Sequence, residues 1–161
     1  MEVVKFEYIG ICNYFNFRGA VIQFVGVFDT REEATIKCKE RLNYMSEKDV
    51  HFSDGNFRIF QNYIENKFPF LSVIYYSCPS DAFVYVHFVG VFEDIKTTYK
   101  KIKFEIEDKK HQLLFDVKKY MRGFLNPYND VNDFTMEHIE EIYDINFKIF
   151  EINRPNAQEL T

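Results

Sequence analysis

The histidines are the side chains of this sequence best suited to acid–base chemistry or metal binding. The four histidines fall in different predicted elements, and the sequence contains no GxSxG, HExxH, P-loop or dinucleotide-binding motif. His138 and Glu141 are one helical turn apart and, with Asp133, offer the ligand types of a metal site. An exposed helix face rich in glutamate needs no metal to explain these residues. We therefore expect neither a metal nor a cofactor.

The cysteines are the next candidates for chemistry. Cys12, Cys38 and Cys78 are an odd number without a CxxC pair, which argues against a zinc site and against a disulfide framework. We interpret them as buried free thiols of a protein made in a reducing compartment. Cys38 lies on the apolar side of a predicted helix with no histidine nearby in sequence, which favours a core thiol over a nucleophile. Because no catalytic constellation is found, we predict that the protein is not an enzyme.

Gln23 and His87 occupy equivalent positions in a repeated sequence. The pentapeptide FVGVF occurs at residues 24–28 and 88–92, and the residues before it alternate as expected for strands, AVIQFVGVF and VYVHFVGVF. A polar position on the less buried face of a sheet accounts for both residues. The alternative is that Gln23 and His87 face a cleft between two related halves and bind a small ligand there.

The repeat extends beyond the pentapeptide. After FVGVF both copies predict a helix, and Thr30 to Glu33 form a capping box at the first one. Further strand candidates precede each copy at residues 5–15 and 68–77. NFRIF at residues 56–60 returns as NFKIF at residues 146–150, so the offset between the copies grows from 64 to 90. The second copy has therefore gained 26 residues between its helix and its last strand.

These blocks predict an α+β fold built from two strand-strand-helix-strand units. The chain is expected to form a single domain over residues 1–161, with repeats over about residues 1–63 and 64–155 and a C-terminal tail over residues 153–161. We expect the units to pair into one antiparallel sheet with the helices packed on one face. The second unit adds an extended helix and a short helix.

The glycines of the pentapeptide predict a local irregularity. Gly26 and Gly90 each stand alone, which favours a bulge or a close backbone approach over a phosphate cradle. The neighbouring apolar residues are expected to be buried where the two units join. These residues are Val25, Val27, Phe28, Val89, Val91 and Phe92.

The net charge of −5 is unevenly distributed. Residues 1–95 carry 9 basic and 13 acidic side chains, residues 96–125 carry 9 and 4, and residues 126–161 carry 2 and 8. A solvated helix face accounts for the basic segment, and the alternative is a partner-binding surface on helical turns that the fold does not need. The candidate residues of that surface are Lys109, Lys110, Lys118, Lys119, Arg122 and Tyr128. Nucleic acid is disfavoured as the partner because the acidic segment would compete for the basic helix.

A strand ending in VGVF and followed by a capped helix beginning TREEA, at Thr30 to Ala34, resembles small uncharacterised proteins of nucleocytoplasmic large DNA viruses. The composition, rich in Phe, Asn, Ile and Lys, is similar to theirs. The resemblance covers about 25 residues of each copy, and the second copy departs from it at residues 93–98. It implies virion-associated structural proteins or factors that act on host proteins.

The leading hypothesis is a non-enzymatic structural or protein-interaction protein, such as a minor capsid component, that binds capsid or other virion proteins and is able to form oligomers. The 30 Phe and Tyr residues exceed what a small core readily hides, and surplus aromatic side chains favour partner contacts. The alternative is a small-ligand or regulatory binding module that uses the cleft between the repeats. The longest apolar stretch, residues 20–28, is too short for a membrane helix, so we expect the protein in the cytoplasm or in a virion.

Overall fold

A computed structural model describes residues 3–63, 68–77, 83–122, 135–153 and 156–160. The elements follow each other as β1 (Phe6–Asn16), β2 (Gly19–Phe28), α1 (Arg31–Lys48), β3 (Ser53–Tyr63), β4 (Phe70–Ser77), β5 (Val84–Phe92), α2 (Ile95–Arg122), α3 (Met136–Ile142), β6 (Asp144–Asn153) and β7 (Asn156–Leu160). The predicted α+β class is confirmed. The order strand-strand-helix-strand occurs twice, with α3 and β7 added to the second unit.

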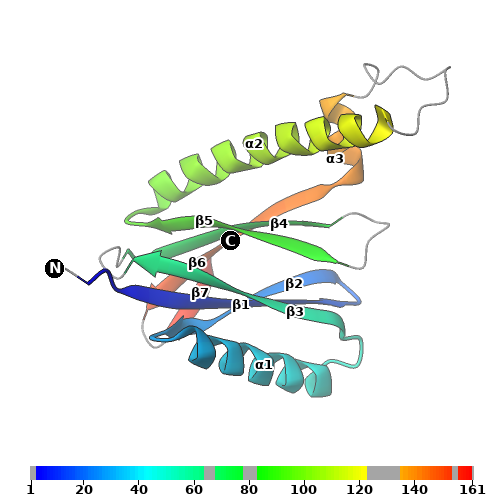
Figure 1. Cartoon of the computed structure of the whole chain (residues 1–161). Helices are drawn as coiled ribbons and strands as arrows, with labels where there is room; N and C mark the ends of the chain where they lie inside the picture. The colour runs from blue at the N-terminus through cyan, green and yellow to red at the C-terminus, as the bar shows by residue number, and fades with distance from the viewer. Residues whose placement is uncertain (1–2, 64–67, 78–82, 123–134, 154–155, 161) are drawn as a thin grey trace.

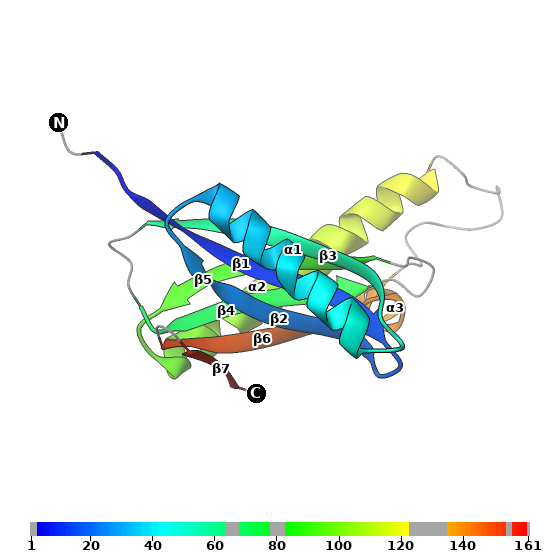
Figure 2. The ribbon, with the colours of Figure 1, turned by 90° about the horizontal axis from the view of Figure 1, so that it is seen from below.

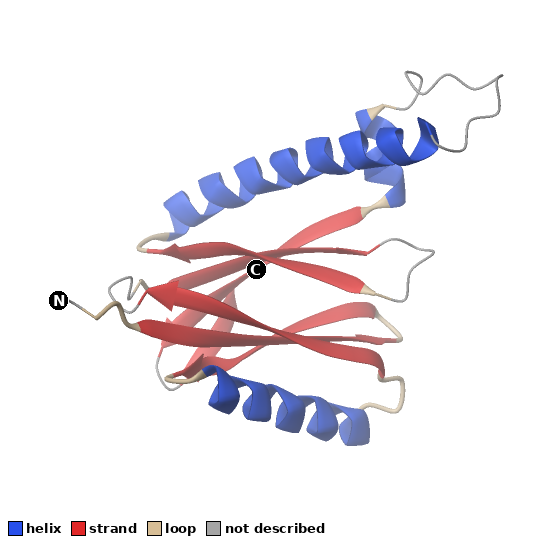
Figure 3. Cartoon of the chain, in the orientation of Figure 1, coloured by secondary structure: helices blue, strands red, loops and turns tan. Residues whose placement is uncertain are grey.

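The strands form two antiparallel sheets, so the prediction of one shared sheet with helices on one face is wrong. The first sheet has the order β2-β1-β3 and the second has the order β5-β4-β6-β7. Figure 1 shows the sheets stacked face to face, with α1 covering the outer face of the first and α2 covering the outer face of the second. Figure 3 shows the same four layers by element type, and Figure 2 shows α1 lying across its sheet.

The main core lies between the two sheets. The core is formed by side chains on the inward faces of the two sheets, so both units contribute to it. Its buried members are Ile9, Ile11, Ile22, Leu71, Val73, Val84, Val86, Phe150 and Ile152. The two units therefore meet through their apolar sheet faces, which explains why they do not pair edge to edge.

Two aromatic pairs show how the halves are related. Phe24 of β2 stacks on Phe150 of β6 with 5.8 Å between the ring centroids. Phe60 of β3 stacks on Phe88 of β5 at 5.2 Å. In the sequence repeat Phe24 corresponds to Phe88, and Phe60 corresponds to Phe150. Each pair is therefore the counterpart of the other, as an approximate twofold axis between the sheets would require. This supports the predicted duplication, as does the matching order of the first three strands in each unit.

The repeated glycines lie at matching bulges. The pairing of β1 with β2 shifts register beside Gly26, and the pairing of β4 with β5 shifts beside Gly90, as predicted. A methyl group on either glycine would lie 2.8 Å from the ring carbon Cζ of Phe28 or of Phe92. Each phenylalanine therefore covers the glycine two positions before it, which explains why the sequence VGVF occurs in both units.

The bulge also decides which residues reach the join between the units. Val27 and Val91 pack against the core between the sheets, as predicted. Val25 and Phe28 instead line a pocket beside α1, and Val89 packs with Ile102 of α2. The six predicted join residues are all only partly buried. The prediction is wrong for those on the helix side. The bulge interrupts the period-two alternation, so Val25 and Val89 face the helices although Val27 and Val91, two residues later, face the core.

The inner faces of α1 and α2 also match. Thr30 accepts a hydrogen bond from the Glu33 backbone N–H at 3.1 Å, and Asp94 accepts one from the Thr97 N–H at 2.7 Å. These N-cap residues are 64 positions apart. The two buried residues of α1, Ala34 and Cys38, correspond to Thr98 and Ile102 of α2, which are also buried.

The second unit departs from the first beyond the shared core. The last turns of α2 pack on α3 through Leu113 and Ile139, which form a third cluster with Tyr76. The prediction that these surplus turns stay out of the core is therefore wrong for their inner face. Residues 156–160 of the predicted tail form β7, which pairs with β6.

Substitution of the repeated glycines should distinguish backbone strain from crowding. Gly90 has φ +154°, a conformation that disfavours other residues, whereas Gly26→Ala requires only that the Phe28 ring shifts. We expect Gly90→Ala to lower the free energy of unfolding by about 1–3 kcal/mol. Gly26→Ala should cost less, with urea denaturation as the measurement. Equal losses in the two variants would contradict this account of the bulge.

Ser72 offers a stabilising substitution. Its hydroxyl is fully buried and has no hydrogen-bond partner among the described residues. The equivalent strand position in the first unit is Gly10, since Gly10 pairs with Gly26 as Ser72 pairs with Gly90. Ser72→Ala removes the unpaired hydroxyl and should raise the free energy of unfolding by about 1 kcal/mol. A lower melting temperature for this variant would show that the hydroxyl is satisfied.

Candidate functional site

The outer face of α2 carries two exposed aromatic side chains. Phe104 is 65% exposed and Phe115 is 67% exposed. They are 11 residues apart, which is about three helical turns, so they project along one line on the face turned away from the sheet. His111 lies between them on the same line and is also exposed. We call Phe104, His111 and Phe115 the α2 outer stripe.

Three lysines near the two ends of the stripe are open to solvent. Lys100 and Lys101 lie beside Phe104, and Lys119 lies beside Phe115; all three are exposed, and Lys118 is half-buried. Residues 96–125 carry a net charge of +5. The outer face of α2 therefore combines aromatic surface with positive charge near both ends.

The structure divides the predicted basic surface. Lys110 is only 19% exposed at its side chain and forms ion pairs with Glu107 at 3.5 Å and with Glu140 at 3.0 Å. The Nζ of Lys109 donates to Gln112 at 2.9 Å and lies 6.0 Å from the ring centroid of Tyr76 on β4. Both lysines therefore turn toward the sheet and α3, so they do not belong to the outward surface predicted for them.

The other members of the predicted surface are Lys118, Lys119, Arg122 and Tyr128. Lys118 and Lys119 lie in the last turns of α2, and Arg122 ends the helix. The side chain of Arg122 and the whole of Tyr128 lie outside the described part of the chain. Lys119 is therefore the exposed lysine that the prediction and the described surface share.

The structure does not bring Gln23 and His87 together. The Sγ of Cys12 lies 3.9 Å from Oε1 of Gln23, on the α1 side of the first sheet. His87 stacks on Tyr76 at 5.6 Å, on the α2 side of the second sheet. The inter-sheet core separates them. The interpretation that both face a cleft between the repeats is therefore wrong, although their positions in the two strands do correspond.

His87 lies in an environment that opposes its protonation. Its ring is about half-buried, and Nε2 has no hydrogen-bond partner among the described residues. Burial, followed by the positive charges of Lys109 and Arg58, lowers the pKa of His87 from 6.5 to about 4. Neutral His87 stacks on the ring of Tyr76, which also stacks on Tyr85. This is the environment of a structural histidine.

Cys12 and Cys38 are buried free thiols, as predicted, whereas Cys78 lies outside the described residues. Burial raises the pKa of Cys12 to about 12 and that of Cys38 to about 11, and the charge of Arg41 opposes both shifts. Both thiols remain protonated at neutral pH, which makes them poor nucleophiles.

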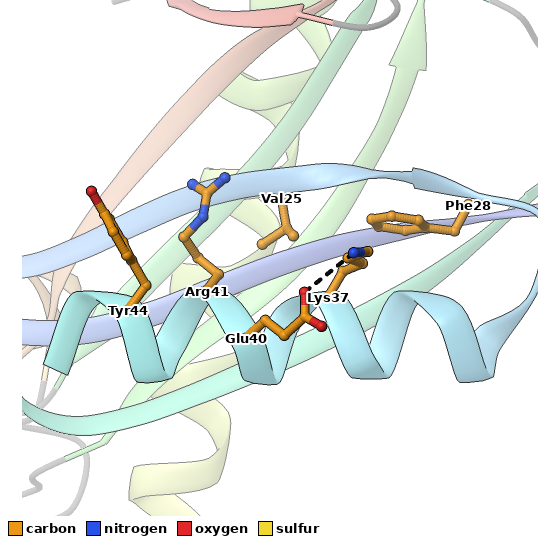
Figure 4. A pocket seen from close by; sticks show the side chains of 6 residues that line it. All are labelled: Val25, Phe28, Lys37, Glu40, Arg41 and Tyr44. Carbon is orange, nitrogen blue, oxygen red and sulfur yellow. Dashed lines mark hydrogen bonds and ion pairs between the residues drawn. The ribbon is translucent and has the colours of Figure 1, made fainter. Parts of the chain in front are cut away.

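A shallow pocket of about 290 Å³ opens between α1 and β2. Val25 and Phe28 of β2 form its apolar side, and α1 supplies Lys37, Glu40, Arg41 and Tyr44 (Figure 4). The Nζ of Lys37 pairs with Glu40 at 3.2 Å. Figure 4 shows the guanidinium of Arg41 extending from the helix toward β2, between Tyr44 and Val25. We call this the α1–β2 pocket.

A second hollow on the other flank of α1 has a different chemistry. It encloses about 390 Å³ and is lined by neutral side chains and one cation, Lys39. Its remaining lining residues are Leu42, Asn43, Ser46, Phe52 and Gly55. The pair of cationic side chains beside an apolar surface is therefore a property of the α1–β2 pocket and not of both flanks of the helix.

His138, the histidine of the metal site considered from the sequence, has a structural role. Nδ1 of His138 accepts a hydrogen bond from the backbone N–H of Thr135 at 2.9 Å, which caps α3. Asp133 lies outside the described residues. Within the described ranges no group of three or more His, Cys, Asp or Glu side chains could hold a metal ion. In the same ranges, no helix combines the length and apolar character that a membrane span requires.

Sequence reasoning missed Phe104, Phe115, Arg41 and Tyr44 as candidate site residues. The repeat contains a signal for Phe104, Arg41 and Tyr44, because each differs in chemical type from the residue 64 positions away in the other copy. Phe104 aligns with Glu40, Arg41 with Glu105, and Tyr44 with Asp108. No protein-family model matches the chain, and neither does any curated protein sequence or solved structure.

His87 should make the stability of the protein depend on pH. A histidine whose folded pKa is about 4 and whose unfolded pKa is 6.5 favours folding fully above pH 6.5, and that contribution is lost as the pH falls toward 4. His87→Gln installs the residue found at position 23. We expect the urea midpoint of this variant to fall less between pH 7 and pH 4.5 than that of the parent. His111→Gln, at an exposed position, is the control, and an unchanged pH profile in His87→Gln would contradict the assignment.

Proposed function

We propose that this chain is a non-enzymatic interaction protein that binds an acidic protein partner through the outer face of α2. The observation that carries the proposal is the α2 outer stripe, where Phe104 and Phe115 are each about two-thirds exposed in line on one helix. Phenylalanine is enriched at interfaces, because its burial on binding is strongly favourable. Single exposed aromatic residues are ordinary on protein surfaces, whereas two in register on one helix suit docking of a partner.

The charges around the stripe define the partner's chemistry. Lys100 and Lys119 lie at opposite ends of the exposed face, 19 residues apart, which corresponds to about 28 Å along the helix. Glu107 and Asp108 lie between them. A complementary surface would carry carboxylates near its two ends, apolar side chains opposite Phe104 and Phe115, and hydrogen-bond donors opposite Glu107 and Asp108. Such complementarity favours association and fixes the orientation of the partner.

The same charges disfavour a second copy of this chain as the partner. If two α2 helices met antiparallel with Phe104 against Phe115, Lys100 of one copy would face Lys119 of the other. A parallel arrangement would place each lysine opposite its own counterpart. Like charges in contact oppose association, so a partner of opposite charge fits this face better.

The sequence resemblance supplies a setting for this activity. The expected resemblance to small proteins of nucleocytoplasmic large DNA viruses rests on the VGVF strand and the helix beginning TREEA, about 25 residues of each copy. We therefore propose a minor capsid or other virion component as the specific form of the function. A viral factor that binds a host protein in the cytoplasm would use the same surface.

Photocrosslinking tests the proposed surface. A photoreactive phenylalanine analogue replaces Phe104 in one variant and Phe115 in another, and Ile36 on α1, which is 55% exposed, in a control. In host cells, positions 104 and 115 should both crosslink to one protein through a segment rich in Asp and Glu. At about 1 M salt, where the Debye length is about 3 Å, the yield should fall strongly.

The charge variant Lys100→Glu/Lys119→Glu should lose the same crosslink while keeping its melting temperature, because exposed substitutions usually change stability by at most about 0.5 kcal/mol. A crosslinked product of twice the chain mass would identify a second copy as the partner and overturn the acidic-partner proposal. The proposal also fails if positions 104 and 115 give no partner, or if position 36 captures the same protein with equal yield.

A further inference from the structure

We propose that the α1–β2 pocket binds a small monocarboxylate with an apolar body, with Arg41 as the carboxylate-binding residue. This activity is separate from partner binding by α2, since α1 and α2 cover opposite outer faces of the molecule (Figure 1). The proposal depends on the position of Arg41, on the formal charges of the lining, and on the apolar side formed by Val25 and Phe28.

Arg41 is the cation in the pocket that is available to a ligand. Lys37 is paired with Glu40 at 3.2 Å, whereas Arg41 makes no ion pair or hydrogen bond with a side chain among the described residues. Its guanidinium extends over the pocket toward β2 (Figure 4). A guanidinium presents two parallel N–H groups that match the two oxygens of a carboxylate.

The charges of the lining favour a monoanion. Lys37 and Arg41 contribute two positive charges and Glu40 contributes one negative charge, which leaves a formal charge of +1. A carboxylate neutralises this charge. A phosphate monoester, which carries close to two negative charges at neutral pH, would leave an excess negative charge beside Glu40.

The apolar side of the pocket accounts for the rest of the ligand. Val25 and Phe28 are only partly buried, although both are apolar residues of a strand covered by α1. Tyr44 forms the wall beside Arg41, and the Nζ of Lys48 lies 5.2 Å from its ring centroid. At about 290 Å³ the pocket is at the lower end of the usual range for small-ligand sites, so a compact body such as one phenyl ring suits it.

The second unit provides an internal comparison. Val25, Phe28 and Lys37 have identical counterparts in Val89, Phe92 and Lys101. Arg41 and Tyr44, however, are replaced by Glu105 and Asp108. The apolar side therefore belongs to the shared architecture, whereas the groups that would bind the carboxylate occur in the first unit alone. A purely structural need for Arg41 and Tyr44 would be expected to recur beneath α2.

Titration with phenylacetate tests the proposal. Heteronuclear NMR should show saturable shifts confined to the residues around the pocket, with a dissociation constant of about 1 mM, as expected for a ligand of this size. Phenylacetamide has the same shape without the charge and should bind at least about tenfold more weakly. Phenyl phosphate should also bind more weakly than phenylacetate.

Variants separate the arginine from general charge effects. Arg41→Glu, which copies the residue of the second unit, should abolish saturable binding, and Arg41→Lys should weaken it about tenfold because the paired N–H geometry is lost. Lys39→Gln on the other flank of α1 should bind as the parent does. An unchanged NMR spectrum away from residue 41 would show that each variant is folded.

Three results would overturn the proposal. The first is the absence of saturable shifts with phenylacetate, and the second is equal affinity for phenylacetamide. The third is full affinity in the folded Arg41→Glu variant. None of these results bears on the α2 outer stripe, so the two proposals stand or fall separately.

Discussion

Each sheet has two apolar faces, and one helix can cover only one of them; this constraint determines how the halves associate. The remaining face of each sheet is covered by the other half, through the core that includes Ile9, Ile11, Leu71 and Val73. The stacked pairs of phenylalanines place equivalent residues on both sides of this contact. A three-stranded sheet with a single helix would leave that face in water, so each unit depends on the other for burial of its core.

The constraint explains why some residues are shared by both units. Gly26 and Gly90 accompany bulges that separate Val27 and Val91, which pack on the core between the sheets, from Val25 and Val89, which face the helices. Phe28 and Phe92 cover the glycines, and in the first unit Phe28 thereby forms part of the α1–β2 pocket. Residues common to both units, Val25 and Phe28, thus form the apolar side of the pocket, and residues found only in the first unit, Arg41 and Tyr44, complete it.

The sequence predicted the elements far better than their assembly. Alternation over residues 84–92 matches β5, and the N-cap expected at Thr30 matches the start of α1, because these signals depend on neighbours along the chain. The single-sheet prediction was wrong because alternation indicates which residues share a face and not what covers it. The aligned pair Gln23 and His87 failed as a site for the same reason. Arg41 becomes a candidate only when the contact between β2 and α1 is known.

Divergence between the units separates what the fold requires from what it permits. The inner helix positions retain buried residues, Ala34 and Cys38 in α1 against Thr98 and Ile102 in α2, since these positions cover the sheets. The outer and flanking positions of the two helices differ in charge and polarity. Glu40 of α1 corresponds to the apolar Phe104 of α2, and the basic Arg41 corresponds to the acidic Glu105. Neither exchange is demanded by packing on the sheet, because Phe104 is largely exposed and Arg41 lies at the rim of a pocket. The two helices cover their sheets in the same way, and their unlike outer surfaces are therefore free to bind unlike ligands.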